Sequence, residues 1–434
     1  MGKRILTSAV VAVAIALASP SIVSAESKKA PDYSSAKKLK LMAAFPPAQN
    51  KLVTKENWLV PPYNRYAYLH ARELFPSKSF TREFKVGKGF DEAIKGSLAH
   101  IMVKDVNGKE ILLDDFLKQA YTDGFLVLHH GEIVYERYWN GATAATPHAL
   151  FSITKSFTGT LIGILEARGL IEYAKTVSHY LPELKDSGYG DASIRQMMDM
   201  QVGVAWDESP EAVADPNGVF KRYLTASGFA PSAEIGSAYT FLPTMKKANE
   251  HGEKFQYVAP VTDVLGWLLE RVSGKSYTQL LNDEIITKLK IEGDGFMLLD
   301  GWGKALSTGG LNLTPRDLAR FGLMIEQNGR YEGQRIVSEE FISDTRFNGD
   351  KVAFSKGGKD SSWLPGGSYR NQWWTPAGER PSIQAAGIYG QNLFVDQDTG
   401  VVIVRVSSTP GSHDATDELM TPLYQEISKI LSAD

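Results

Sequence analysis

The sequence predicts an α/β fold in which an antiparallel sheet is flanked by helices and carries a large helical insertion. Two hairpins predict the sheet. Residues 125–128 and 133–139 are strand-like and flank a turn at Gly131, and residues 393–395 and 401–406 form a second such pair near the C-terminus. Because the chain between the hairpins is mostly helical in pattern, we expect one sheet assembled from distant segments.

The helical patterns follow in chain order. Residues 152–168 form an apolar helix that Gly169 closes, and Thr262 is placed to cap a helix that ends at Gly274. Three more helices are expected over residues 193–200, 315–328 and 416–431. These helices supply the insertion and the last layer of the predicted fold.

The N-terminus has the pattern of a signal peptide. Two basic residues at positions 3 and 4 precede an apolar run over residues 5–18, and small residues follow at 23–25. The run is short for a membrane span, and an uncleaved anchor is the alternative. We expect the mature chain to begin near Glu26 and the protein to be exported, either periplasmic or secreted, with no later membrane span.

Three segments are predicted. Residues 1–25 are the signal peptide, and residues 26–114 are a leader followed by an N-terminal packing arm. The leader, to about residue 50, is expected to be flexible because it is rich in Lys, Ser, Ala and Pro and shows no period. An aromatic stretch over residues 58–82 is expected to pack on the main domain, which spans residues 115–434.

Composition excludes several classes of protein. The chain of 434 residues has 47 basic and 50 acidic side chains and a net charge of -3, without the positive excess of a nucleic-acid-binding surface. It has no cysteine, which excludes disulfides and thiol catalysis. Metalloprotease, phosphate-loop and nucleophile-elbow motifs are absent from the sequence. We therefore expect no metal, no organic cofactor and no nucleic-acid partner; the oligomeric state is left open.

The chemistry is expected at Ser152 and Lys155, which are three residues apart and therefore share one face of the predicted helix. Serine needs a proton acceptor at neutral pH, and a buried lysine whose amine is neutral can serve. The same spacing occurs at Ser34/Lys37 and Ser35/Lys38, so the spacing alone is common. Unlike those pairs, Ser152 follows a strand hairpin and opens an apolar helix, which favours a catalytic pair.

Four stretches, taken in order, resemble the serine β-lactamase-like superfamily. Residues 151–157 resemble the first motif of class C β-lactamases and, more closely, that of family VIII carboxylesterases and 6-aminohexanoate-dimer hydrolases. Residues 255–257 resemble the second motif, residues 309–322 a structural segment, and residues 387–391 the third motif region. The resemblance implies a β-lactamase/penicillin-binding-protein-like fold over residues 115 to 430.

The resemblance also implies roles for individual residues. Tyr257 is the candidate for the phenol that passes protons beside the nucleophile, although Ala259 stands where the usual motif has Asn. Literal Tyr-x-Asn matches at Tyr138 and Tyr369 are out of order, so we interpret them as chance. The backbone amides of Ser152 and Ile388 are expected to form an oxyanion hole.

Substrate contacts are less well defined by the sequence. Ala385 occupies the place where the third motif usually carries a cation, which argues against tight binding of a substrate carboxylate. Arg370, Arg380 or Arg65 could replace that charge. The expected substrate-binding residues are Tyr389, Trp373, Trp374 and Arg370.

The resulting hypothesis is an exported serine hydrolase that cleaves ester or amide bonds of a small molecule or short oligomer through an acyl-enzyme on Ser152. Lys155 is the base and Tyr257 relays the proton, as in a 6-aminohexanoate-dimer-hydrolase-like amidase or a carboxylesterase. Two alternatives stay open: a non-catalytic cell-wall-binding protein on the same fold, and a β-lactamase or D-Ala-D-Ala carboxypeptidase.

Overall fold

The fold is α/β with antiparallel sheets, as the sequence predicts. The computed structural model describes residues 33–81, 89–208, 212, 215, 217–230 and 236–433. The predicted signal peptide and the expected start at Glu26 lie outside the described residues. Within them, no helix is long and apolar enough to cross a membrane.

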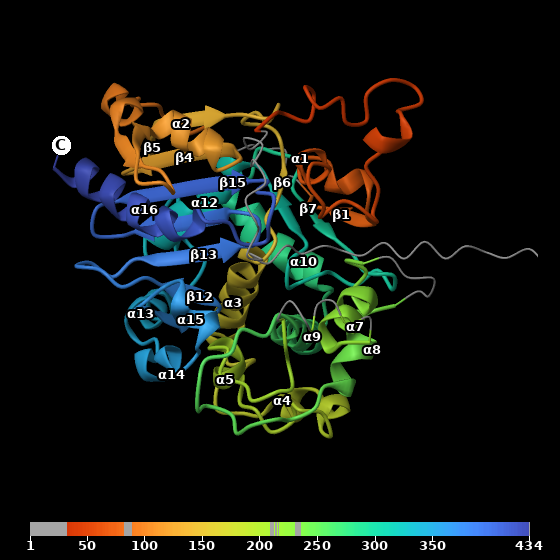
Figure 1. The fold of residues 1–434 in the computed structure, drawn as a ribbon. Helices are drawn as coiled ribbons and strands as arrows, with labels where there is room; N and C mark the ends of the chain where they lie inside the picture. The colour runs from red at the N-terminus through yellow and green to blue at the C-terminus, as the bar shows by residue number, and fades with distance from the viewer. Residues whose placement is uncertain are drawn as a thin grey trace, which may run out of the picture.

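The two predicted hairpins are confirmed and meet in one sheet (Figure 1). β4 (Thr122–His129) and β5 (Glu132–Tyr138) form the first, and β14 (Gln391–Asp396) and β15 (Val401–Ser407) form the second. β15 pairs with β4, so the sheet joins segments almost 300 residues apart along the chain. The strand order is β11-β12-β13-β14-β15-β4-β5, and every neighbouring pair is antiparallel. The remaining strands of this sheet are β11 (Ser368–Arg370), β12 (Trp373–Thr375) and β13 (Ile383–Gly387).

Alternating side chains bury both faces of the sheet. Phe125 and Val127 of β4 face α2 (Leu113–Gln119) and α16 (Asp417–Ser432), whereas Leu126 and Leu128 face the main core. Burial of such apolar side chains is the dominant stabilising contribution in a domain of this size. Against the main-core face lie α3 (Ile153–Glu166) and α12 (Pro315–Glu326), and α3 also contacts α9 (Pro260–Ser273).

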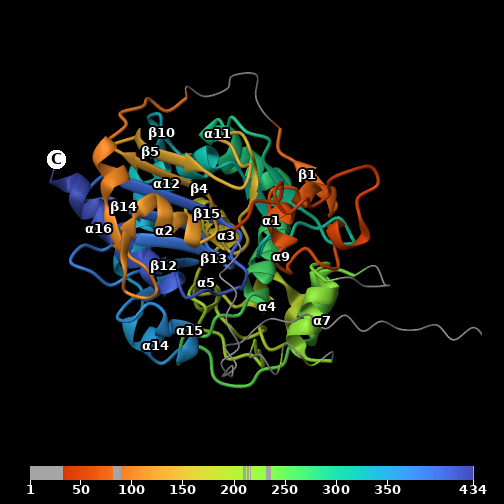
Figure 2. The ribbon, with the colours of Figure 1, turned by 45° about the horizontal axis from the view of Figure 1, so that its top comes forward.

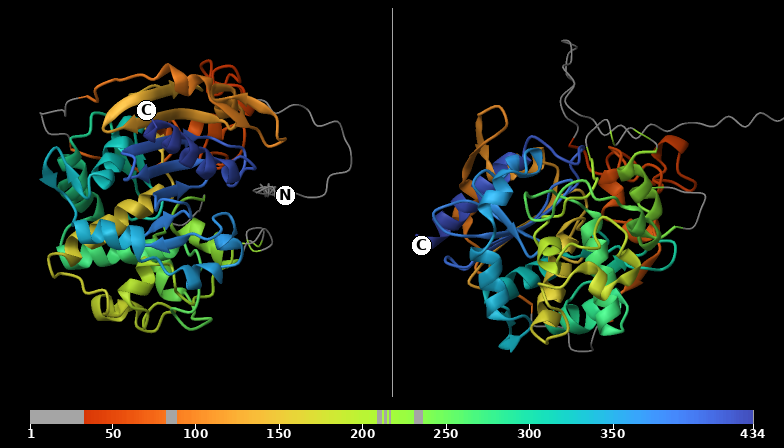
Figure 3. Two further views of the ribbon diagram at one scale, coloured as in Figure 1. Left: turned by 90° about the vertical axis from the view of Figure 1, so that its left-hand side faces the viewer. Right: turned by 90° about the horizontal axis from the view of Figure 1, so that it is seen from below.

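The helical insertion lies on the far side of α3 from the sheet, which Figure 3 shows in yellow and green below the orange and blue strands. Its helices are α4 (Val177–Tyr180), α5 (Ile194–Met198), α7 (Val219–Ala226), α8 (Ala238–Phe241), α9 and α10 (Tyr277–Leu281).

The prediction that Thr262 caps α9 is wrong. The cap position is Ala259, three residues earlier, because Pro260 fits the first helical position, and Thr262 lies inside the first turn. Gly274 ends the helix in the left-handed conformation, as predicted.

A second, four-stranded sheet joins the N-terminal arm to the domain (Figure 1 and Figure 2). Its strands are β1 (Ser77–Ser79), β7 (Phe296–Leu298), β8 (Leu311–Leu313) and β6 (His148–Ala149), in that order. The arm, residues 33–79, ends in β1, also holds α1 (Asn64–Ala67) and contributes a separate aromatic cluster. Ala36 and Leu41 belong to that cluster, so this part of the expected flexible leader packs on other residues, whereas residues 43–46 are exposed.

The other short elements lie around the site, and one of them carries Asp360, which accepts a hydrogen bond from the backbone amide of Tyr257. Two small hairpins are formed by β2 (Met102–Lys104) with β3 (Glu110–Leu112) and by β9 (Arg330–Tyr331) with β10 (Gln334–Arg335). The remaining helices are α11 (Thr287–Leu289), α13 (Glu339–Phe347), α14 (Lys351–Ser355) and α15 (Lys359–Ser362).

Candidate active site

Ser152 and Lys155 face each other at the N-terminus of α3. The Nζ atom of Lys155 donates a hydrogen bond to the Oγ atom of Ser152 at 2.8 Å and a second to the carbonyl oxygen of Thr308 at 2.9 Å. Ser152 is the residue just before the first helical turn, and its side chain is partly exposed. A hydroxyl that is reachable from solvent and bonded to a buried amine is the arrangement that nucleophilic catalysis requires.

Lys155 lies in an environment that favours its neutral form. Its residue is 2% exposed, and burial lowers the pKa of its amine to about 8. The carboxylates of Asp263 and Glu208 act in the opposite direction and hold that pKa up. About a tenth of the amine is therefore unprotonated at pH 7, far more than for an exposed lysine, and can accept a proton.

Tyr257 stands on the other side of the nucleophile. Surrounding protein raises the pKa of its phenol, while a hydrogen bond with Ser152 acts to lower it. The ring is partly exposed, and the Nζ atom of Lys155 lies 5.2 Å from its centroid. Its backbone amide donates to a carboxylate oxygen of Asp360 at 3.1 Å. Because its pKa is raised, the phenol stays protonated and is suited to donate rather than to remove a proton.

The end of β13 closes the site from the sheet side. A Cβ atom at Gly387 would lie 2.5 Å from the carbonyl oxygen of Leu150 and 3.1 Å from the amide nitrogen of Ser152, so only glycine allows this approach. The approach brings Ile388, the next residue, to the turn that carries the nucleophile. Among the described residues, no acceptor takes the amide proton of Ser152 or of Ile388.

The expected substrate-binding residues differ in how close they lie to Tyr257 and in how deeply they are buried. Trp374 stacks on the ring of Tyr257 with centroids 5.6 Å apart, which places it in the wall of the site. Trp373, on the same strand, is fully buried and stacks on Phe321. Tyr389 is 2% exposed, so its ring belongs to the core beside Ile388 and offers little surface to a substrate.

The three arginines considered as replacements for the missing cation are already paired. Arg370 donates to Asp199 and to both carboxylate oxygens of Asp344. Arg65 bonds the buried carboxylate of Asp123, and the carboxylate of Asp396 is 3.6 Å from Arg380. Ala385 itself is fully buried. Hydrogen bonds therefore hold Arg370 and Arg65 to their carboxylates, whereas Arg380 is held only by its longer ion pair.

The out-of-order Tyr-x-Asn matches have structural partners. Tyr138 donates a hydrogen bond of 2.5 Å to Glu136 on the same strand. Tyr369 is buried and packs edge-on against Tyr257 and Trp374. Neither tyrosine is bonded to Ser152 in the described part of the chain, which leaves Tyr257 as the phenol at the nucleophile.

Three contributors to the site were not singled out from the sequence. Thr308 supplies the carbonyl that binds Lys155, and the only signal is its place directly before the Gly309-Gly310 pair. Asp263 is buried on α9 and accepts from Tyr223 at 2.6 Å. The Glu208 carboxylate accepts a hydrogen bond from the Trp206 indole at 2.7 Å, and its charge acts to raise the pKa of Lys155. Neither carboxylate belongs to a motif, so only the fold shows that both are near the base.

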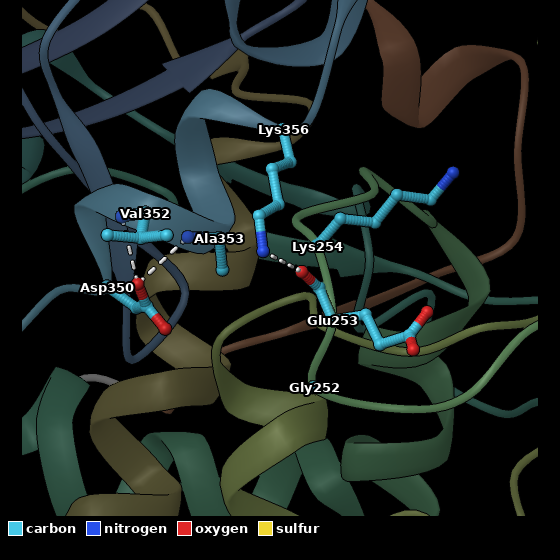
Figure 4. A pocket seen from close by; sticks show the side chains of 7 residues that line it. All are labelled: Gly252, Glu253, Lys254, Asp350, Val352, Ala353 and Lys356. Carbon is cyan, nitrogen blue, oxygen red and sulfur yellow. Dashed lines mark hydrogen bonds between the residues drawn. The ribbon is translucent and has the colours of Figure 1, made fainter.

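A surface pocket of about 430 Å³ lies beside the segment that leads to Tyr257 (Figure 4). It is lined by Gly252, Glu253, Lys254, Asp350, Val352, Ala353 and Lys356. The Asp350 carboxylate caps α14 by accepting two backbone amides, and Lys254 points away from the other side chains. This pocket does not include the nucleophile or the base. In the described parts of the chain, no group of three or more His, Cys, Asp or Glu side chains is placed to hold a metal ion.

Fold and site together define a serine hydrolase of the β-lactamase family, to which the chain belongs. A sequence profile described as Beta-lactamase matches residues 112–422. The 6-aminohexanoate-dimer hydrolase of Paenarthrobacter ureafaciens is 33% identical over 370 residues, which cover 85% of this chain and 91% of that relative.

Solved structures agree with this assignment. A Bacillus anthracis protein provisionally described as a 6-aminohexanoate-dimer hydrolase superposes with a TM-score of 0.80 at 30% identity, covering 89% of this chain and 99% of its own. A family VIII carboxylesterase shares the fold alone, with a TM-score of 0.50 at 17% identity over 70% of this chain and 91% of its own. The expected family and branch are thereby confirmed.

Proposed function

We propose that the protein hydrolyses amide or ester bonds through a covalent intermediate on Ser152, with Lys155 as general base and Tyr257 as proton relay. The observation that carries the proposal is the 2.8 Å contact between the Ser152 hydroxyl and a buried amine whose pKa is lowered to about 8. Such a pair has no evident structural use that would offset the cost of burying a lysine.

Acylation begins when the neutral amine of Lys155 takes the proton of Ser152. The Ser152 oxygen then forms a bond to the substrate carbonyl carbon, and the carbonyl oxygen becomes an oxyanion. The free amides of Ser152 and Ile388 are suited to bind that oxyanion, and such preorganised donors are usually a large part of catalysis. Collapse breaks the bond to the leaving group, which takes a proton from the Tyr257 phenol; the phenol regains it from Lys155.

Deacylation runs through the same groups in reverse. Water replaces the leaving group, loses a proton to the Tyr257–Lys155 pair, and attacks the ester carbon. The Ser152 oxygen then leaves and regains its proton, which restores the enzyme. No step requires a metal or an organic cofactor.

We propose linear amides and simple esters as the substrate class. The curated relative with 33% identity is named for a linear amide dimer. This chain lacks the usual cation at position 385, and the three arginines considered as replacements are paired with carboxylates. The missing cation disfavours the alternative of a β-lactamase or D-Ala-D-Ala carboxypeptidase, whose substrates carry a carboxylate close to the scissile bond. In a linear 6-aminohexanoate dimer a long methylene chain separates the carboxylate from the amide.

We also propose that the protein acts outside the cytoplasm after removal of residues 1–25. The basic start, apolar run and small residues at 23–25 support this. N-terminal sequencing of the exported protein would show a start at or near Glu26; an intact Met1 would contradict the proposal.

The test of catalysis is a labelling experiment. A fluorophosphonate probe should modify the wild-type protein, with the mass increment mapped to Ser152, and Ser152→Ala should neither be labelled nor turn over any substrate. The Ser152 hydroxyl is partly exposed, so the variant should fold normally. The same preparation is then assayed with 6-aminohexanoate dimer and p-nitrophenyl butyrate. A protein that resists the probe and cleaves neither substrate would instead fit the alternative of a non-catalytic binding protein.

A further inference from the structure

Two bulky residues beside the oxyanion site have left-handed backbone conformations. Phe151, directly before Ser152, has φ of +46°, and Tyr389, directly after Ile388, has φ of +64°. Side chains of this size rarely adopt such a conformation unless the surrounding structure holds them there. The directions of the Ser152 and Ile388 amides therefore depend on whatever holds Phe151 and Tyr389.

One ring from the N-terminal arm contacts both of these residues. The ring of Tyr68 packs edge-on against Phe151, with centroids 4.9 Å apart, and lies 5.2 Å from the ring of Tyr389. The rings of Phe151 and Tyr389 are 5.4 Å apart. Since Tyr68 is fully buried, the three rings form a closed set in which none can move without displacing the others.

The arm is itself fixed to the domain around this contact. The carbonyl oxygen of Tyr68 accepts a hydrogen bond from the amide of Ala149 on β6, three residues before the nucleophile. Trp58 stacks on Phe151 at 5.6 Å, and its indole donates to the carbonyl oxygen of Phe229. Asn64 donates to the carbonyl oxygen of Thr409, just beyond β15. The position of Tyr68 is thus set by both sheets.

We propose that the N-terminal arm is part of the active site, with Tyr68 as a positioning residue that holds Phe151 and Tyr389 in place and so aligns the two oxyanion-binding amides. The inference rests on the proposed function, because it assigns the arm a task in the same acyl transfer. It predicts that loss of the Tyr68 ring weakens binding of the transition state more than binding of the substrate.

A purely structural role for the arm predicts a different result. In that case any buried aromatic residue of the arm would affect activity only through the folded fraction of the protein. Phe75 is the matched control: it is 5% exposed and packs on Trp58 at 4.7 Å, but among the described residues its ring contacts neither Phe151 nor Tyr389. Phe75→Leu therefore removes comparable packing from the same arm without touching the three-ring set.

The experiment compares Tyr68→Leu, Tyr68→Phe and Phe75→Leu with the wild type. For Tyr68→Leu, we expect kcat for p-nitrophenyl butyrate to fall about tenfold or more while KM changes less than about threefold, since small displacements of oxyanion donors have large effects on rate. The affinity for phenylboronic acid, whose adduct on Ser152 carries a negatively charged tetrahedral boron, should fall by a similar factor. Tyr68→Phe keeps the ring and should retain a kcat near that of the wild type.

Thermal unfolding of each variant separates a positioning role of Tyr68 from a purely structural role of the arm. Phe75→Leu should lose stability to a similar degree yet keep its kcat within about twofold to threefold. The inference is overturned if Tyr68→Leu and Phe75→Leu lose kcat equally at equal folded fraction, or if Tyr68→Leu changes KM alone. Should Tyr68→Leu not accumulate as folded protein, Tyr68→Met, which has a similar volume but a longer, unbranched side chain that adapts to irregular space, is tested for the same kcat loss. A wild type without hydrolase activity would instead refute the proposed function.

Discussion

Asp263 accepts a hydrogen bond from the Ser307 hydroxyl at 3.0 Å, which ties the interior of α9 to the segment beneath Lys155, the proposed base. The next residue, Thr308, presents the carbonyl that binds the Nζ atom of Lys155. Tyr223 donates to the other carboxylate oxygen of Asp263 at 2.6 Å. The buried carboxylate therefore both orients the base and places a negative charge near it.

Replacing Asp263 by Asn should shift the pH dependence of the enzyme. The Asp263 carboxylate holds the pKa of Lys155 up, so its removal lowers that pKa and moves the acid limb of kcat/KM to lower pH. On the alkaline plateau, kcat should still fall about tenfold, because the Thr308 carbonyl loses part of its support. A pH profile of kcat/KM from pH 5 to 10 measures both effects.

The matched control for this variant is Asp199→Asn. Asp199 is equally buried, but it pairs with Arg370 and is not among the charges that act on Lys155. The acid limb should stay in place for Asp199→Asn whatever its effect on stability. Equal shifts in the two variants would mean that the pH dependence does not report on Lys155.

The wild-type profile should itself rise through an apparent pKa of about 8. In the proposed mechanism the neutral amine of Lys155 acts, so kcat/KM should fall below that pH and level off above it. The fall should be less steep than tenfold per unit, because Glu208, with a pKa raised to about 7, and Asp263, with a pKa raised to about 6, become neutral in this range and no longer hold the pKa of Lys155 up. Besides Asp263, the titratable groups that face the amine are Glu208 and Tyr257, and the raised pKa of Tyr257 keeps its phenol protonated across the plateau. A rate that is constant from pH 6 to 9 would contradict the assignment of Lys155 as base.

Tyr257→Phe should lower kcat by about 10²-fold, because the change removes only the proton-transferring hydroxyl and leaves the stack on Trp374 in place. Tyr369→Phe is the control, since its ring packs against both Tyr257 and Trp374 but it has no bond to Ser152 among the described contacts. Its kcat should stay within about threefold of the wild type. Single-turnover kinetics with an activated ester measure the chemical step directly. If both variants lost the same factor, the phenol of Tyr257 would be structural.

The sequence predicted what local spacing determines. Ser152 and Lys155 are one helical turn apart, so their meeting follows from the helix alone, and the two hairpins follow from strand patterns on either side of a turn. Thr308 and Asp263 reach the base only through tertiary packing of separate segments, and no spacing rule connects them to Lys155.

The arm was harder to predict for a related reason. Residues 33–50 have the composition of a flexible leader, yet Ala36 and Leu41 are buried in a cluster that also holds Trp58 and Tyr68. Low hydrophobicity indicates that a segment cannot form a core of its own, but it does not indicate whether the segment packs on the core of another. At the start of α9, Pro260 occupies the first helical position, which its fixed backbone angle favours, and Thr262 therefore lies inside the helix and not at its cap.

The last prediction concerns substrate choice. A charge-assisted hydrogen bond to a carboxylate contributes about 1.5–3 kcal/mol, so a site without the cation should lose roughly one to two decades in kcat/KM on substrates that depend on it. Ala385 offers no charge, and Arg370, Arg380 and Arg65 each face a carboxylate of the protein. For uncharged esters, the missing cation should not lower kcat/KM. We expect kcat/KM for p-nitrophenyl butyrate to exceed that for nitrocefin on the same preparation, with nitrocefin turnover slow or undetectable. If nitrocefin were preferred by a decade, another cation must reach the substrate, and Arg370→Ala and Arg380→Ala would show whether either arginine leaves its carboxylate to do so.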